Sequence, residues 1–146
     1  MKVPLFVLGL LIVIILIFIS IGYLNPQPPT AEINGHVFSL FLAQTSQEQE
    51  IGLAKFNKID KNQGMLFIFQ KADYYRFWMK NMRFPIDIIF INKDKVVDIF
   101  PKVPVSKNGI LPIYTTSARA DKVLEINSGL SDEYKIKKGS EIKISL

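Results

Sequence analysis

Residues 64–69 read Gly-Met-Leu-Phe-Ile-Phe. Five consecutive apolar residues after a glycine are typical of a strand that is covered on both faces. We therefore expect residues 65–69 to form a central strand, with other strands on each side of it.

The chain that follows predicts three more strands. Residues 75–79 are the most aromatic part of the sequence, and Pro85 precedes a second apolar run at residues 86–91. A turn of the type Asn-Lys-Asp-Lys then leads into residues 96–100, so the last two runs are expected to form a hairpin.

Upstream of the central run, an Asn34-Gly35 pair stands between apolar residues. This pair is the strongest short-range signal for a tight hairpin, and residues 37–43 continue as a strand. Thr45 and Glu48 then have the spacing of a capping box, in which each side chain satisfies the other residue's backbone N–H. They predict a helix over residues 46–54 that turns three apolar residues to the core: Ile51, Leu53 and Ala54.

The C-terminal third alternates breakers with short apolar segments. Prolines and the Ser-Lys-Asn-Gly sequence make residues 101–112 a loop or an edge strand. Residues 122–126 are expected to form a strand and residues 130–136 a short helix. Polar and apolar residues alternate over 141–146, which predicts a half-buried last strand.

The N-terminus carries a different signal. Leu5 to Leu24 is a run of 20 residues without a charge, and as a helix it would be roughly 30 Å long, the thickness of a bilayer's hydrocarbon core. We expect a membrane anchor over residues 1–24, a proline-rich linker over 25–31 and a folded domain over 32–146. Lys2 is the only charged side chain before Glu32, so the start of the chain is expected in the cytoplasm and the domain outside it. Tyr23 is placed to anchor the helix at the membrane interface.

A cleaved signal peptide is the alternative for this segment. Small residues at Ser20 and Gly22 could be read by a signal peptidase, and the domain would then be secreted. The apolar run exceeds the usual length of such peptides, which favours the anchor.

Composition excludes several function classes. The chain has 18 Lys and Arg against 13 Asp and Glu, and these charges are mixed along the sequence rather than gathered on one element. Nucleic-acid domains concentrate their basic residues, so no nucleic-acid partner is expected. There is no cysteine, and His36 is the only histidine, so we expect no metal site and no cofactor.

Three segments together resemble the family known as domain of unknown function 192. They are residues 64–69, the Phe-Trp-Met-Lys-Asn-Met sequence at 77–82 and the Pro-Ile-Asp-Ile-Ile-Phe-Ile sequence at 85–91. Further agreement extends the resemblance from about Ile33 to Ile144. It implies a compact α+β domain with a mostly antiparallel, barrel-like sheet and one or two short helices, often exported, and it implies no known reaction. Gln49, Ile51, Ala54 and Met82 depart from the family's usual pattern.

Candidate ligand-binding residues lie in the same segments. We expect Trp78, Lys80, Asn81 and Asp87 to lie near one rim, where they offer a flat ring, donors and acceptors to a polar ligand. An equally simple interpretation is a buried ion pair between Lys80 and Asp87, with Trp78 in the core. Ser117 is a further candidate, as a nucleophile with Lys80 as its base.

The sequence therefore predicts a membrane-anchored, extracytoplasmic binding module for a peptide, a glycan or an envelope protein. Two alternatives stay open. One is a small hydrolase or transferase that uses Asp87, Lys80 and Ser117. The other is an assembly factor that presents a sheet edge to another chain.

Overall fold

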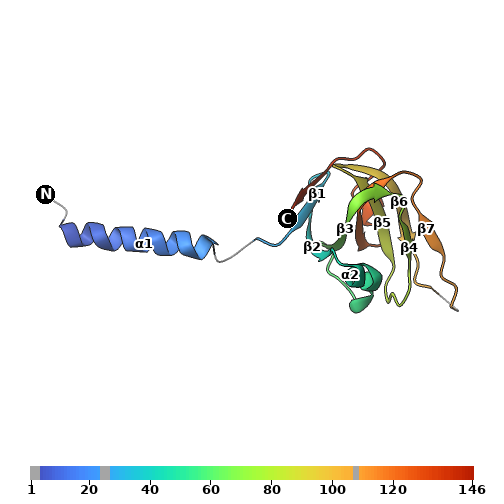
Figure 1. Ribbon diagram of the computed structural model, residues 1–146, viewed down its shortest axis with the longest axis horizontal. Coiled ribbons are helices and arrows are strands. Elements are labelled where there is room, and N and C mark those ends of the chain that lie inside the picture. The colour runs from blue at the N-terminus through green and yellow to red at the C-terminus, as the bar shows by residue number, and fades with distance from the viewer. Residues whose placement is uncertain (1–3, 24–26, 107–108) are drawn as a thin grey trace.

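The structure, a computed structural model, describes residues 4–23, 27–106 and 109–146. It is an α+β protein built around one curled sheet (Figure 1). The sheet has the strand order β6-β5-β8-β3-β2-β1-β9. Its members are β1 (Thr30–Ile33), β2 (His36–Ala43), β3 (Gln63–Asp73), β5 (Ile86–Asn92), β6 (Lys95–Val103), β8 (Ala120–Asn127) and β9 (Ile142–Ser145).

The sheet is antiparallel except between β2 and β3. Parallel neighbours need a crossover connection, and here the α-helix α2 (Ser46–Ile51) and the 3₁₀ helix η1 (Gly52–Lys55) supply it. At one end the two edges of the sheet meet, because Lys95 bridges Glu141 and the Val96 N–H donates to the Ser140 carbonyl at 2.9 Å. The result is a half-barrel of the mostly antiparallel kind that the family resemblance implied.

Local signals in the sequence form as expected at the start of the domain. Asn34 and Gly35 both have positive φ, 51° and 79°, and join β1 to β2 in a tight hairpin. The Thr45 hydroxyl accepts from the Glu48 N–H at 3.2 Å, and the Glu48 carboxylate accepts from the Thr45 N–H at 2.9 Å. The predicted capping box is confirmed.

The helix it begins is shorter than predicted. Gly52 has φ 55° and ψ −144°, which no α-helix accommodates, so α2 ends at Ile51 and the chain continues as η1. The prediction that Ile51 faces the core is wrong, because this side chain is 45% exposed. Leu53, which η1 turns inward, is fully buried.

A second sheet was not foreseen. β4 (Arg76–Trp78) pairs with β7 (Ile113–Thr115) and not with the main sheet. The predicted helix over 130–136 is reduced to α3 (Leu130–Glu133). β6 extends through Pro101 to Val103, which its position at the edge of the sheet permits.

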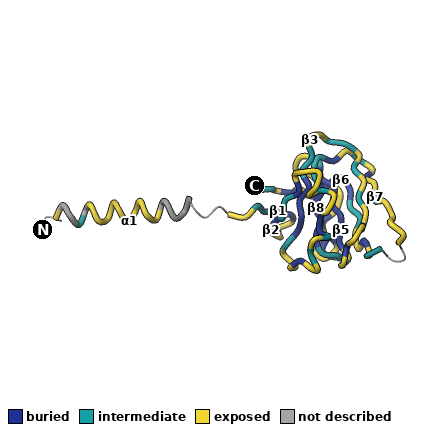
Figure 2. Tube along the Cα trace, turned by 60° about the horizontal axis from the view of Figure 1, so that its bottom comes forward, coloured by how far each residue is buried: buried dark blue, intermediate teal, exposed yellow. Residues whose placement is uncertain are grey.

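The main sheet buries apolar side chains on both faces. An inner cluster draws on all seven strands and so lies within the curl; it includes Phe38, Leu66 and Leu124. An outer cluster lies on the opposite face of β3, β5 and β8, beneath η1 and β4; it includes Leu53, Phe67 and Phe90. Figure 2 shows the buried positions running along these strands.

The helix α1 (Leu5–Tyr23) stands apart from this core (Figures 1 and 2). Its side chains from Leu10 to Phe18 are between 41% and 72% exposed. Within the described ranges, no helix has both the length and the apolar character needed to cross a bilayer. Lys2, Leu24, Asn25 and Pro26, on which parts of the anchor and linker predictions rest, lie outside those ranges, and so does the side chain of Tyr23.

Candidate ligand pocket

A pocket opens on the outer face of the sheet, between the crossover and β4. The end of α2 and η1 form one side, β4 and the residues after it form the other, and β3 and β8 form the floor. Its volume is about 150 Å³. We call it the Glu125 pocket, after the acid at its floor. Phe67, Phe69, Tyr75, Phe77 and Trp78 make the lining strongly aromatic.

Glu125 is the most unusual residue of this pocket. It lies on β8 in register with Met65 of β3 and Ile88 of β5, so the sheet holds it from both sides. The residue is 4% exposed, and its Oε2 is buried without a hydrogen-bond partner among the described residues. Burial raises the pKa of Glu125 to about 8, so most of this carboxyl is protonated at neutral pH.

Gly52 keeps the space next to this carboxyl open. A Cβ at this position would stand 3.3 Å from Cζ of Phe67 and 3.9 Å from Oε2 of Glu125. Its positive φ also favours glycine. The same residue that ends α2 thus puts no side chain between the crossover and the acid at the pocket floor.

The mouth of the pocket carries charges and an exposed ring. Trp78 is 48% exposed, and the Lys80 ammonium lies 5.9 Å from the centre of its ring. Lys80 also lies 3.9 Å from a Glu50 carboxylate oxygen, a long and solvated ion pair. Arg76 is exposed beside them. The structure therefore brings together two of the predicted residues, Trp78 and Lys80.

Asn81 lies next to this mouth, in a shallower hollow that Glu50 and Lys80 also line. Its φ is 60°, a conformation that Asn tolerates better than most residues, and it follows directly after Lys80 at the turn beyond β4. The position of Asn81 is thus consistent with a turn residue and with a contact at the pocket's edge.

Asp87 lies elsewhere. Alternation along β5 puts Ile86, Ile88 and Phe90 in the outer cluster and turns Asp87 to the opposite face of the sheet. Its carboxylate accepts from the N–H groups of Lys102, Gly129 and Ser131 at 2.7, 2.9 and 2.7 Å, and from the Ser131 hydroxyl at 2.6 Å. The expected rim of four residues is therefore corrected, since Asp87 is absent from it. The alternative of a buried Lys80–Asp87 ion pair is also wrong, because Lys80 is exposed and pairs with Glu50.

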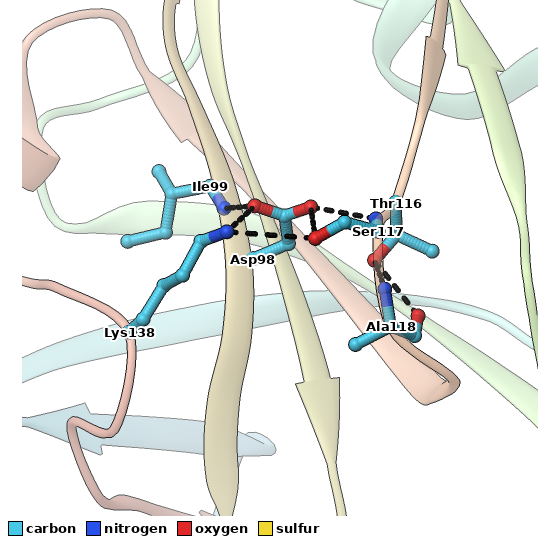
Figure 3. Close-up of polar contacts among 6 residues, drawn as sticks. All are labelled: Asp98, Ile99, Thr116, Ser117, Ala118 and Lys138. Atoms are coloured by element: carbon cyan, nitrogen blue, oxygen red, sulfur yellow. Dashed lines mark hydrogen bonds and ion pairs between the residues drawn. The ribbon is translucent and has the colours of Figure 1, made fainter.

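Ser117 belongs to a third location, shown in Figure 3. Its hydroxyl donates to Asp98 at 2.8 Å, and its N–H donates to the same carboxylate oxygen at 2.7 Å. The lysine beside it is Lys138, 3.5 Å from Ser117 Oγ and 2.8 Å from Asp98. Burial alone would raise the pKa of Asp98, but hydrogen bonds from Lys138, Ser117 and Ile99 lower it to about 2.

This arrangement does not activate the serine. An acceptor with a pKa of about 2 is too weak a base to take a proton from a hydroxyl group at neutral pH. The cluster instead joins β6 to the loop before β8 and to the turn at Lys138. Asp87, Lys80 and Ser117 thus occupy three separate surroundings, and the geometry offers no common site for the hydrolase alternative.

Sequence reasoning missed Glu125, although a signal was present. Like Asp87, Glu125 is an acid within an apolar strand, in the sequence Val-Leu-Glu-Ile at 123–126, where an unpaired carboxylate would be costly. In residues 4–23, 27–106 and 109–146, no cluster of three or more His, Asp or Glu side chains could hold a metal ion. His36 is exposed and stacks on Tyr134, with ring centres 3.7 Å apart.

Comparison with known proteins gives a family but no activity. The model of the family DUF192, described as "Uncharacterized ACR", matches residues 29–144. A comparison with curated proteins finds no match.

Two solved structures share the fold. A protein of unknown function from Novosphingobium aromaticivorans DSM 12444 is 34% identical with a TM-score of 0.70; the match covers 80% of this chain and 83% of that one. A protein from Sinorhizobium meliloti 1021, described as a proposed transcription regulator, is 21% identical with a TM-score of 0.72; that match covers 82% and 98%. The second similarity concerns the fold alone.

Proposed function

The chain belongs to the DUF192 family, whose description gives no activity. We therefore propose a function from its own pocket: a membrane-anchored binding module that holds one group of a partner molecule against Glu125. The observation that carries the proposal is the Oε2 atom of Glu125, which is buried, unpartnered and next to an open pocket. Leaving a buried polar atom without a partner costs about 1–3 kcal/mol. A ligand that supplies the missing hydrogen bond recovers part of that free energy on binding.

The lining supports a particular shape of ligand. Deep in the pocket the walls are Leu53, Phe67 and Phe77, so the inserted part must be narrow and mainly apolar, with a polar group at its end. Apart from Glu125 at the floor, the charged side chains of the lining are exposed at the mouth, where Trp78, Lys80 and Asn81 can contact the rest of the partner. Among the partners predicted from sequence, this division favours a peptide over a glycan, whose rings carry hydroxyl groups on all sides.

Trp78 makes the proposal directly testable. It is the only tryptophan in the chain and lies at the mouth of the pocket, so its fluorescence reports on occupancy. The full-length protein in detergent is titrated with n-butylamine, n-butanol, butyramide and butyrate, which share a short apolar chain and differ in the terminal group. We expect saturable changes in Trp78 emission with at least one of them, and none with Glu125→Leu, which fills the floor with an apolar side chain. The proposal fails if none of the four is bound, or if Glu125→Leu binds as the unaltered protein does.

The anchor is the second part of the proposal. The apolar run of the sequence, Leu5 to Leu24, extends beyond the side chains that the structure describes, and the side chains from Leu10 to Phe18 in α1 are exposed. Large apolar side chains left exposed on every side of a helix are suited to lipid rather than to water. We place the domain on the extracytoplasmic side of the cell membrane.

Cell fractionation tests the anchor. We expect the protein in the membrane fraction after carbonate washing, with the folded domain open to added protease in spheroplasts. N-terminal sequencing of the mature protein separates the two interpretations of the segment, since a protein that begins after Gly22 and is released by buffer has lost a signal peptide.

A further inference from the structure

We infer that the group held by the Glu125 pocket is a primary alkylammonium, such as the side chain of a lysine in a partner polypeptide. This inference rests on the proposed function and names its ligand class. It is drawn from three features of the pocket: the single buried acid, the aromatic walls and the position of Lys80.

The buried acid selects for a donor. Among the acidic and basic side chains of the described lining, Glu125 alone is buried, while Glu50, Arg76 and Lys80 are exposed at the mouth. An ammonium has three N–H donors and no acceptor, so it can satisfy Oε2 and leave no lone pair of its own buried. A ligand carboxylate could be held there only by sharing the Glu125 proton, and it would add a second desolvated acid at the floor.

The aromatic walls suit a cation more than a neutral group. The faces of Trp, Tyr and Phe attract cations that lie within about 6 Å of the ring centre. Phe67 and Phe77 meet edge to face, with their centres 5.0 Å apart, and Trp78 follows Phe77 in the same strand. A straight alkyl chain entering past Trp78 would contact these rings along its length before its ammonium reached Glu125.

Lys80 provides an example of an ammonium bound between an aromatic ring and a carboxylate at the mouth of the pocket. Its ammonium lies between the Trp78 ring, at 5.9 Å, and the Glu50 carboxylate, at 3.9 Å. The protein thus places one of its own alkylammonium groups against an aromatic face and an acid. Both distances are long, so a ligand ammonium could displace Lys80 from this position. A ligand lysine would compete for this mouth site and would also gain the deeper acid.

Binding of a cation must ionise Glu125. Since burial holds the proton on this carboxyl at neutral pH, each ammonium bound at pH 7 releases close to one proton. Affinity for an ammonium therefore increases as the pH rises from 6 to 8. A ligand carboxylate that shared the Glu125 proton would show the opposite dependence, and a hydroxyl or amide ligand would release no proton.

The test uses Nα-acetyl-lysine methylamide and its uncharged analogue Nα-acetyl-norleucine methylamide, with the full-length protein and Trp78 emission as the readout. We expect the lysine probe to bind at least about tenfold more tightly at pH 7.5, and Glu125→Gln to abolish that preference while retaining weak binding of both probes. Lys80→Met removes the internal competitor, so it should tighten binding of the lysine probe a few-fold. n-Pentylamine, which lacks the peptide groups, separates a lysine of a polypeptide from a free amine.

The inference is overturned if the norleucine probe binds equally well, if Glu125→Gln keeps the preference for lysine, or if affinity falls between pH 6 and 8. In each case some ligand still occupies the pocket, and the proposed function stands without its ligand class. The proposed function itself fails if no probe changes Trp78 emission, or if Glu125→Leu responds to the probes as the unaltered protein does. Should Glu125→Gln not fold, the pH dependence and proton release of the unaltered protein give the same decision.

Discussion

Gly64 of β3 lies so close to Glu125 of β8 that a Cβ on the glycine would stand 2.8 Å from the Glu125 carbonyl oxygen. The obstacle is backbone, and the added carbon would also meet the side chains of Leu124 and Ile126 at 3.1 Å. Close approach of these two strands therefore depends on glycine at position 64, and it fixes the depth at which Glu125 lies in the pocket.

Gly64→Ala should consequently separate β3 from β8 and destabilise the protein by about 1–3 kcal/mol, the usual cost of overpacking a core. Chemical unfolding followed by circular dichroism measures the change. Gly35→Ala is the matched control, because nothing lies within 4 Å of a Cβ there and its cost comes only from the positive φ of the hairpin. A Gly64→Ala protein as stable as the unaltered one would mean that β3 and β8 can accommodate the added Cβ without separating.

Glu125 itself should make the protein less stable as the pH rises. In the unfolded chain the carboxyl loses its proton near its ordinary pKa of 4.5, whereas the folded state retains the proton until about pH 8. The folded state binds more protons across this window, so the free energy of unfolding falls between pH 4.5 and pH 8, by up to roughly 5 kcal/mol from this group.

Glu125→Met removes this dependence and keeps the approximate size of the side chain. We expect the variant to be more stable than the unaltered protein at pH 8, to differ less at pH 5, and to bind no ligand in the pocket. Unfolding curves at both pH values give the comparison. If the free energies of unfolding of the two proteins differ by the same amount at pH 5 and at pH 8, Glu125 is not protonated in the folded state. A gain in stability with a loss of binding is expected of a residue kept for function.

The parts of the fold that sequence predicted are those governed by neighbours in the chain. The Asn34-Gly35 hairpin and the Thr45–Glu48 capping box depend on two to four consecutive residues, and both form. In the apolar run at 65–69, Met65, Leu66 and Phe67 are buried and the last two residues are half-buried, because the strand lies in the middle of the sheet. The pairing of β4 with β7 joins segments of three residues that are far apart in the chain. Neither segment is long enough for its sequence to predict which strand it pairs with.

The candidate site shows where local reasoning ends. Asp87 and Glu125 are both acids within apolar strands, and the sequence gives no way to rank them. Opposite Asp87 the fold places the backbone N–H groups around Gly129, which satisfy the carboxylate. Opposite Glu125 the fold places the aromatic pocket, which supplies no hydrogen bond to Oε2. The difference is made by elements distant in sequence, so the acid that lacks partners could be found only in the folded molecule.

Asp87→Ala should therefore destabilise the protein strongly. It leaves three backbone N–H groups without their acceptor, and each loss of this kind costs about 1–3 kcal/mol, so the total should reach at least about 3 kcal/mol. Thermal unfolding measures this effect, and titration of the folded fraction with the lysine probe measures binding. Binding by that fraction should be unchanged, because Asp87 lies on the other face of the sheet. Lost binding with full stability would restore Asp87 as a ligand-binding residue.

Protonation of Asp98 should lower the free energy of unfolding at acidic pH. Its pKa is about 2 in the folded state and 3.8 ordinarily, so its hydrogen bonds to Ser117 and Lys138 stabilise the fold above pH 3.8, and this contribution is lost as the pH falls toward 2. The shift corresponds to roughly 2 kcal/mol. Asp98→Asn should lower the free energy of unfolding by about that amount at pH 6 and by little at pH 2, measured by chemical unfolding at the two pH values.

Glu133→Gln is the control, because its ion pair with Lys61 is exposed at both ends and should contribute little at either pH. An equal loss at pH 2 and pH 6 would show that the Asp98 carboxylate acts through packing rather than through its charge.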